Sequence, residues 1–227
     1  MVKVKICGIT NWADAKAAVE AGANLLGFNF YRKSPRYIAP AAAARIIRRL
    51  PKRVGAVGVF VNETEAAILE TARRAGLDQL QLHGDESPEL VERLIAEFPV
   101  IKAIRVRSSF RASQLRRFGK ADAVLLDGFD AKQYGGTGKT FDWRLVRRAG
   151  LKTRIFLAGG LTAENAQEAI AVSKPYAVDV CSGVEARPGK KDLRRMRLFL
   201  RAAKSPMKPS VAMTGKRSSK TKAGKRG

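Results

Sequence analysis

The chain alternates eight times between a short apolar run and a helical pattern of roughly a dozen residues. Several of the apolar runs contain almost no polar residue, which is typical of parallel strands covered by helices. The repeat therefore predicts eight βα units around one parallel sheet. The expected strands are residues 2–8, 25–30, 54–61, 79–84, 100–106, 123–128, 154–160 and 177–183. The expected helices are residues 11–21, 40–50, 64–75, 87–98, 109–118, 142–149, 162–172 and 191–203.

Local signals at the ends of these segments support the helices. Polar residues that favour the N-cap position begin five of them, namely Asn11, Thr64, Ser87, Asp142 and Thr162. Glycines follow several of the helix ends, where a left-handed residue often terminates a helix. Eight βα units within about 200 residues favour a closed barrel over an open sheet. We therefore expect the α/β class, with a single (βα)₈ TIM barrel over residues 1–203.

The net charge of +24 is concentrated at one end of the chain. Residues 204–227 contain eight Lys or Arg and no acid, so this segment carries +8 and the first 203 residues carry +16. The segment is also rich in Ser, Gly and Pro, a composition typical of disordered chains. We expect a disordered basic tail over residues 204–227, able to bind nucleic acid weakly through salt-sensitive electrostatics.

Composition also limits the class of protein. Hydrophobic residues make up 45% of the chain, enough for a buried core. A strand pattern begins directly after Met1, leaving no room for a signal peptide, and no apolar run reaches membrane-spanning length. Two cysteines, Cys7 and Cys181, are too few for a disulfide framework. We expect a cytoplasmic protein that does not bind a membrane, and the sequence leaves open whether it is a monomer or a homodimer.

Two polar residues stand out at the ends of expected strands, where active sites of such barrels are assembled. The two-residue alternation of a strand puts Lys5 and Cys7 on one face, opposite Val4 and Ile6. Because Val4 and Ile6 suit the layer that faces the helices, we expect Cys7 to point into the barrel mouth. Asp127 ends the sixth strand at an equivalent height. The two make a candidate base and acid, although a cysteine is often a small buried hydrophobe and an aspartate often caps a turn.

Six segments resemble, in chain order, motifs of the phosphoribosylanthranilate isomerase family of tryptophan biosynthesis. Each motif is short, but six in the same order across residues 1–203 are highly specific. They are KICGIT at residues 5–10, SPRYI at 34–38, QLHG at 81–84, LLD at 125–127, GGTGKTFDW at 135–143, and VDVCSGVE at 178–185 followed by PGKKD at 188–192.

The resemblance implies a substrate and a reaction. The substrate is N-(5-phosphoribosyl)anthranilate, which an Amadori rearrangement converts to the corresponding 1-deoxyribulose 5-phosphate without a redox cofactor, metal or ATP. Asp127 is implied as the general acid and Cys7 as the general base. The acid must be protonated and the base deprotonated, the reverse of what a free carboxyl and a free thiol do at neutral pH. Lys5 is the cation that we expect to lower the pKa of Cys7, although a lysine there could equally be solvated.

The resemblance also implies binding residues. Arg36 is implied to bind the anthranilate carboxylate, which suits a planar guanidinium. The phosphate is expected where the loops after the seventh and eighth strands meet, at Gly159, Gly160, Ser182 and Gly183. Gln81 is expected to line the pocket together with His83. No catalytic role is assigned to His83, because a lone histidine is more often merely hydrogen-bonded.

Three further features of the sequence bear on the interpretation. Residues 138–140 (GKT) imitate a nucleotide-binding P-loop, but position 133, where its first glycine belongs, holds Gln133; we instead expect a glycine-rich loop that closes over the substrate. The related barrel isomerase of histidine biosynthesis, which performs the same rearrangement on a bulkier substrate, is a rival. That family resembles a pattern with Asp at the end of the first strand, where this chain has Cys7, and the difference argues against it. Cys181 replaces a residue that is more often Ser in the family, and it is expected to face inward near Cys7. It either fills the place of the serine or, if the two Cα atoms lie within about 7 Å, allows oxidation to link or block the two thiols reversibly.

Overall fold

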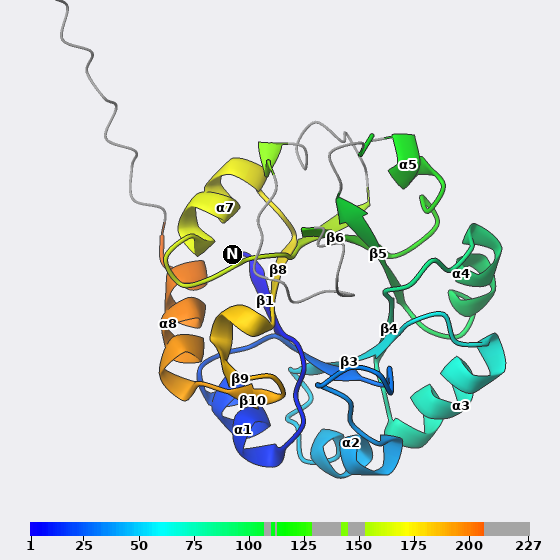
Figure 1. The fold of residues 1–227 in the computed structure, drawn as a ribbon, viewed down its shortest axis with the longest axis horizontal. Helices are drawn as coiled ribbons and strands as arrows, with labels where there is room; N and C mark the ends of the chain where they lie inside the picture. The colour runs from blue at the N-terminus through cyan, green and yellow to red at the C-terminus, as the bar shows by residue number, and fades with distance from the viewer. Residues whose placement is uncertain (107–109, 112, 129–141, 145–152, 207–227) are drawn as a thin grey trace, which may run out of the picture.

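A closed barrel of eight parallel strands forms the centre of the computed structural model (Figure 1), which describes residues 1–106, 110–111, 113–128, 142–144 and 153–206. Each strand hydrogen-bonds to its neighbours in chain order, and β1 closes the ring against β8. This confirms the expected (βα)₈ barrel. The strands are β1 (Lys3–Ile6), β2 (Leu25–Asn29), β3 (Gly55–Phe60), β4 (Gln79–Leu82), β5 (Val100–Val106), β6 (Ala123–Gly128), β7 (Arg154–Leu157) and β8 (Ala177–Val180).

Helices surround the barrel between successive strands (Figure 1). They are α1 (Trp12–Glu20), α2 (Pro40–Ile47), α3 (Glu65–Ala75), α4 (Pro88–Leu94), α5 (Ser113–Arg116), α7 (Ala166–Ser173) and α8 (Leu193–Lys204). The expected helix 142–149 and glycine-rich loop 135–143 lie largely outside the described residues. So does most of the expected tail 204–227, of which only residues 204–206 are described; Lys204 is the last residue of α8, and its ammonium donates to the Gly22 carbonyl.

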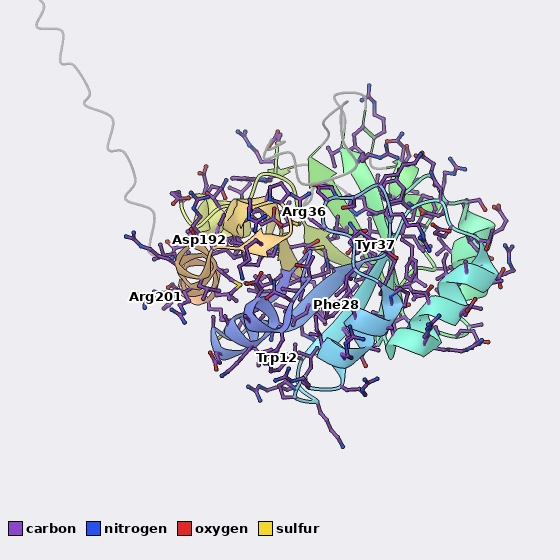
Figure 2. All side chains as sticks on the ribbon, turned by 60° about the horizontal axis from the view of Figure 1, so that its bottom comes forward. Trp12, Phe28, Arg36, Tyr37, Asp192 and Arg201 are labelled. Atoms are coloured by element: carbon purple, nitrogen blue, oxygen red, sulfur yellow. The ribbon has the colours of Figure 1, made fainter. Side chains whose placement is uncertain are left out.

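The alternation of each strand sorts its side chains into two layers. Val4 and Ile6 of β1 and Phe28 of β2 are fully buried against the helices, and Figure 2 shows Phe28 enclosed among the packed elements. The opposite faces of the strands fill the barrel interior with a second, smaller apolar cluster. That cluster consists of Leu25, Val57, Ile101, Ala103, Ala123, Leu125, Phe156, Ala158 and Ala177. Lys5, Cys7 and Asp127 belong to this inward face, as the period of two predicts.

Most of the predicted helix ends are observed. The side chains of Asn11, Thr64 and Ser87 each accept a hydrogen bond from a backbone N–H of the first turn. Thr162 does not cap its helix: α7 begins after Asn165, whose side chain instead accepts from the Thr162 N–H at 2.8 Å. The prediction was wrong there because Asn165 closes a local turn that delays the helix by one turn.

An additional small unit follows β8 and was not expected from the sequence. It consists of a 3₁₀ turn, η1 (Ser182–Val184), and a two-stranded antiparallel hairpin of β9 (Glu185–Arg187) and β10 (Lys190–Lys191). The hairpin places Glu185 and Lys191 beside the carboxyl ends of β1 and β8. Among the described residues, no helix is long and apolar enough to cross a membrane.

Candidate active site

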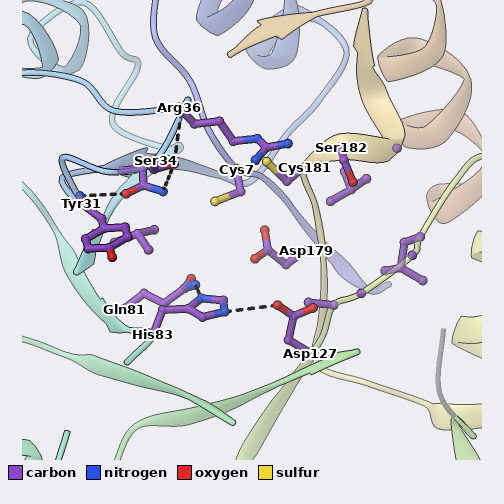
Figure 3. Close-up of a pocket in the computed structure, with 18 of the residues that line it drawn as sticks. Cys7, Tyr31, Ser34, Arg36, Gln81, His83, Asp127, Asp179, Cys181 and Ser182 are labelled. Carbon is purple, nitrogen blue, oxygen red and sulfur yellow. Dashed lines mark hydrogen bonds and ion pairs between the residues drawn. The ribbon is translucent and has the colours of Figure 1, made fainter. Parts of the chain in front are cut away.

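A pocket lies at the carboxyl ends of the barrel strands, above the inner apolar cluster, and contains about 710 Å³ of space, part of it open to solvent. The inward side chains that follow the apolar layer form its floor and walls (Figure 3). All the site residues expected from the sequence except Lys5 line it. These are Cys7, Arg36, Gln81, Asp127, Gly159, Gly160, Ser182 and Gly183.

Lys5 lies beneath the pocket and is completely buried, so the alternative of a solvated lysine is wrong. Its ammonium donates to both carboxylate oxygens of Asp179 at 3.0 Å, since β1 and β8 pair in a register that opposes these two residues. Gly27 makes room for this group: a Cβ there would lie 3.0 Å from the Lys5 Nζ and 2.8 Å from the Cys7 Sγ. A larger residue at position 27 would displace the ammonium or the thiol.

Burial and charge act against each other in this pair. Burial raises the pKa of Asp179 to about 7, with Cys7 and Asp127 adding to the effect and Lys5 opposing it. Burial also disfavours the charge on Lys5, but Asp179 and Cys7 together outweigh it and hold the pKa of Lys5 above its ordinary value. Lys5 is therefore a fixed cation beneath the thiol of Cys7.

Cys7 and Cys181 are neighbours, because the Cys7 N–H donates to the Val180 carbonyl at 2.9 Å. A hydrogen bond between the two thiols holds the pKa of Cys7 well below its ordinary range; burial opposes this, and Lys5 and Lys191 reinforce it. The same hydrogen bond, together with burial, raises the pKa of Cys181. Of the two sulfurs, Cys7 is therefore the one whose ionised form the site favours.

Arg36 is held at the pocket rim by the loop after β2 and by the hairpin after β8. Ser34 Oγ accepts hydrogen bonds from the Arg36 N–H and from Asn29 Nδ2, both at 3.1 Å. The guanidinium donates through Nε and Nη2 to the two oxygens of Glu185, at 2.8 to 3.2 Å. Lys191 Nζ lies 3.0 Å from Glu185 Oε1, so this carboxylate balances two cations.

The opposite side of the pocket is formed by residues of β4 and β6. His83 Nε2 lies 3.2 Å from Asp127 Oδ2, and His83 Nδ1 lies 2.8 Å from Gln81 Nε2. Figure 3 shows the three side chains in a row, with Asp179 between this group and Cys7. Asp127 and Gln81 are almost completely buried, so the polar groups of this row are shielded from bulk water.

Two glycine-containing loops approach each other at one end of the pocket. Gly159 and Gly160 follow β7, both with positive φ, and Gly183 lies in η1. A Cβ on Gly183 would lie 2.0 Å from the Leu161 carbonyl oxygen, so only glycine allows the two loops to meet. Residues of both loops line the pocket.

The sequence missed two charged residues that shape this site. Asp179 shares the inward face of its strand with Cys181, but nothing local in the sequence indicates that it opposes Lys5. Glu185 is separated from Arg36 by 149 positions. Among the described residues, no group of three His, Cys, Asp or Glu side chains is arranged to hold a metal ion.

Comparison with known proteins gives a consistent assignment. A family model described as N-(5'phosphoribosyl)anthranilate (PRA) isomerase matches residues 4–202. The N-(5'-phosphoribosyl)anthranilate isomerase of Pelobacter propionicus is 49% identical over 211 residues, which cover 93% of this chain and 100% of the relative.

Solved structures agree with the sequence relatives. A phosphoribosyl anthranilate isomerase in complex with reduced 1-(o-carboxyphenylamino)-1-deoxyribulose 5-phosphate is 44% identical, with a TM-score of 0.81, and the match covers 90% of this chain and 99% of that one. A structure of monomers generated from the dimeric enzyme of Thermotoga maritima is 44% identical, with a TM-score of 0.79 and the same coverage of both chains. The chain belongs to the N-(5'-phosphoribosyl)anthranilate isomerase family.

Proposed function

We propose that the mouth pocket catalyses the reaction of this family, with Cys7 as general base and Asp127 as general acid. The chain is an isomerase of tryptophan biosynthesis. Its reaction converts N-(5-phosphoribosyl)anthranilate to 1-(2-carboxyphenylamino)-1-deoxyribulose 5-phosphate. The observation that carries the assignment of roles is the presence, in one shielded pocket, of the Cys7 thiol directly after β1, above the buried Lys5 ammonium, and of the Asp127 carboxyl group on β6.

The rearrangement requires two proton transfers, and each has a candidate group. Asp127 gives a proton to the furanose ring oxygen while the bond from that oxygen to C1 breaks, leaving a Schiff base to the anthranilate nitrogen. Cys7 then removes the proton from C2 in its thiolate form, which the lowered pKa of this group favours. The resulting enolamine tautomerises to the ketone. Every electron pair stays within the substrate, so the reaction as written consumes no oxidant or reductant.

The lowered pKa of Cys7 supports its role as base. The Cys181 hydrogen bond is the largest cause, and the nearby ammonium groups of Lys5 and Lys191 add to it. A thiol with an ordinary pKa would be mostly protonated at neutral pH and would first have to lose its proton. We therefore propose the buried cation Lys5 as a modulator of the Cys7 pKa, the role expected from the sequence.

Arg36 is our candidate for the anthranilate carboxylate. Its Nε and one N–H of Nη2 are engaged by Glu185, and among the described residues Nη1 makes no hydrogen bond. That edge of the guanidinium is available to a second carboxylate in a planar geometry. Glu185 fixes the guanidinium in place, which lowers the entropy lost when the substrate binds.

We assign the phosphate to the glycine loops at Gly159, Gly160, Ser182 and Gly183. Their close approach leaves backbone N–H groups without covering side chains, as phosphate recognition in such barrels requires. Gln81 Oε1 is buried and has no hydrogen-bond partner among the described residues, which suits an acceptor for a substrate hydroxyl.

The cellular location, the oligomeric state and the partners of the enzyme are also proposals. Both cysteines are free, as in the reducing cytoplasm where we place the protein. The dimeric relative from Thermotoga maritima makes a homodimer the state to test first, by light scattering, against a monomer. Weak nucleic-acid binding by residues 204–227 remains a prediction of charge alone.

The direct test is turnover of phosphoribosylanthranilate, followed by loss of its fluorescence. We expect the wild-type chain to consume the substrate, and Cys7→Ala and Asp127→Asn each to lower kcat by about 10²- to 10⁴-fold with the circular dichroism spectrum unchanged. Near-normal kcat in either folded variant would contradict the assigned roles. The histidine-pathway substrate is assayed in parallel, and preference for it would favour the rival isomerase.

A further inference from the structure

His83 contacts the proposed general acid through one ring nitrogen and a buried amide through the other. It directly follows β4 and is the single histidine of the 227-residue chain. Its backbone N–H donates to the Phe60 carbonyl at 2.8 Å, which fixes the direction of the side chain toward the pocket. With Nδ1 at 2.8 Å from Gln81 Nε2 and Nε2 at 3.2 Å from Asp127 Oδ2, the imidazole has a partner on each side (Figure 3).

The partner at Nδ1 determines which ring nitrogen carries the proton. With the Gln81 amide oriented as in the structure, its nitrogen donates, and His83 Nδ1 accepts and carries no proton. The ring proton then lies on Nε2 and is donated to Asp127 Oδ2. The reverse orientation of the Gln81 amide would present Oε1 to Nδ1, move the ring proton there and, in a neutral ring, leave a lone pair on Nε2 facing the carboxyl group.

The two oxygens of Asp127 therefore have different environments. Oδ2 faces His83, whereas Oδ1 lies on the side of Gly159, where a Cβ would be only 2.9 Å away from it. Gly159 lines the pocket beside the proposed phosphate loops. A proton on Oδ1 would lie on the Gly159 side of the pocket, whereas a proton on Oδ2 would be directed at the imidazole.

We propose that Gln81 and His83 are positioning residues for the general acid: the Gln81 amide holds His83 as the neutral Nε2–H form, and its donation to Oδ2 keeps the transferable proton of Asp127 on Oδ1. This inference rests on the proposed role of Asp127. When Asp127 gives its proton to the ring oxygen, Oδ2 already accepts a hydrogen bond. That bond becomes charge-assisted as the carboxylate forms, so it stabilises the transition state more than the ground state.

The ring proton can be observed directly because there is only one histidine to label. In protein labelled with ¹⁵N-histidine, long-range ¹H–¹⁵N spectra at neutral pH separate a nitrogen that bears hydrogen from one with a lone pair. We expect Nε2 to bear the hydrogen and Nδ1 to have the lone pair. A neutral ring with hydrogen on Nδ1, or a ring protonated on both nitrogens, overturns the proposal.

Kinetics test whether the hydrogen bond serves catalysis. His83→Gln retains an N–H group that can reach Asp127 Oδ2, whereas His83→Leu has a similar size and no donor. We expect His83→Leu to lower kcat by about 10- to 100-fold, the range for a hydrogen bond to a charged group, with little change in KM. His83→Gln should retain most of kcat. A purely structural role would affect both variants alike, so equal kcat values in two folded variants refute the proposal.

The two proposals can fail separately. A wild-type chain that does not convert phosphoribosylanthranilate overturns the proposed function, whatever the histidine spectrum shows. An active wild-type chain with hydrogen on Nδ1, or with no difference between the Leu and Gln variants, overturns the positioning role alone. Melting curves of both variants show whether any loss of activity arises from unfolding.

Discussion

Replacing Lys5 by Met tests whether the buried cation beneath Cys7 acts through charge. Met is close to Lys in length and apolar, so it fills the same space without the ammonium. The change leaves Asp179 in a site where only 7% of its surface is exposed and where both oxygens have lost a donor at 3.0 Å. Breaking a buried ion pair from one side lowers stability by about 3–5 kcal/mol. We expect a loss of this size at pH 7.

The pH dependence of that loss follows from the pKa of Asp179, which is about 7 with Lys5 in place. Lys5 lowers this pKa, so its removal moves the pKa higher. Above pH 7 the variant's folded state then holds a proton that its unfolded state, with an ordinary carboxyl pKa, lacks. Stability must therefore fall as pH rises, by about 1.4 kcal/mol per pH unit, until the carboxyl ionises in the folded chain. In the wild type, Asp179 with a pKa of about 7 is half ionised at pH 7 and mostly ionised by pH 8, so its contribution to the slope disappears between pH 8 and 9, whereas that of the variant persists.

Urea unfolding at pH 7, 8 and 9 measures these differences. The matched control is the double variant Lys5→Met, Asp179→Asn, in which neither charge remains; we expect it to recover most of the lost stability and to lack the additional slope. Iodoacetamide alkylation of Cys7 gives a second measurement, and its half-maximal pH should move upward in both variants because both lack the cation. A Lys5→Met chain as stable as the wild type, or a double variant as unstable as the single one, would refute the reasoning.

Three further predictions concern the pocket rim, the second thiol and the basic tail. Arg36→Lys should raise KM by about 10-fold or more with a smaller change in kcat, because it mainly weakens ground-state recognition of a carboxylate; a loss confined to kcat would contradict this role. Peroxide should inactivate the wild type in a form that a thiol reductant restores, and Cys181→Ser should recover less, since Cys7 then has no neighbouring thiol with which to form a disulfide; equal recovery would mean that Cys7 oxidises alone. Truncation after Pro206 should leave kcat and Tm nearly unchanged and should weaken any salt-sensitive binding of nucleic acid; a large drop in Tm would show that residues 207–227 dock on the barrel.

The features that sequence analysis predicted are those that depend on neighbours in the chain. The inward direction of Cys7 and Asp127 follows from the two-residue period of a strand, whatever the rest of the fold does. The glycines at positions 159 and 183 lie in the turns that follow β7 and β8, where glycine is a local turn signal. The partners of these residues depend instead on how strands align. Lys5 meets Asp179 only because β1 closes against β8 in one particular register.

Local pattern also fails where tertiary contacts override it. Residues 95–98 continue the helical pattern of their segment, but α4 ends at Leu94 and the chain turns there toward β5. The hairpin of β9 and β10 is short and charged, so it lacks the alternation of apolar residues that identifies a strand. That hairpin carries Glu185, and its position opposite Arg36 was therefore not predictable from the pattern.

The residues that act on the proposed base, Cys7, lie on or directly after other strands of the barrel than the residue that contacts the proposed acid, Asp127. Lys5 on β1 and Cys181, which follows β8, lower the pKa of Cys7, whereas His83, which follows β4, contacts Asp127 on β6. Groups without shared partners contribute nearly additively to activity and stability. Asp179 is an exception, because its ionisation responds to both Cys7 and Asp127. A change that alters the charge of Asp179 must therefore affect the base and the acid together, so Lys5→Met and His83→Leu should combine additively only when Asp179 is replaced by Asn.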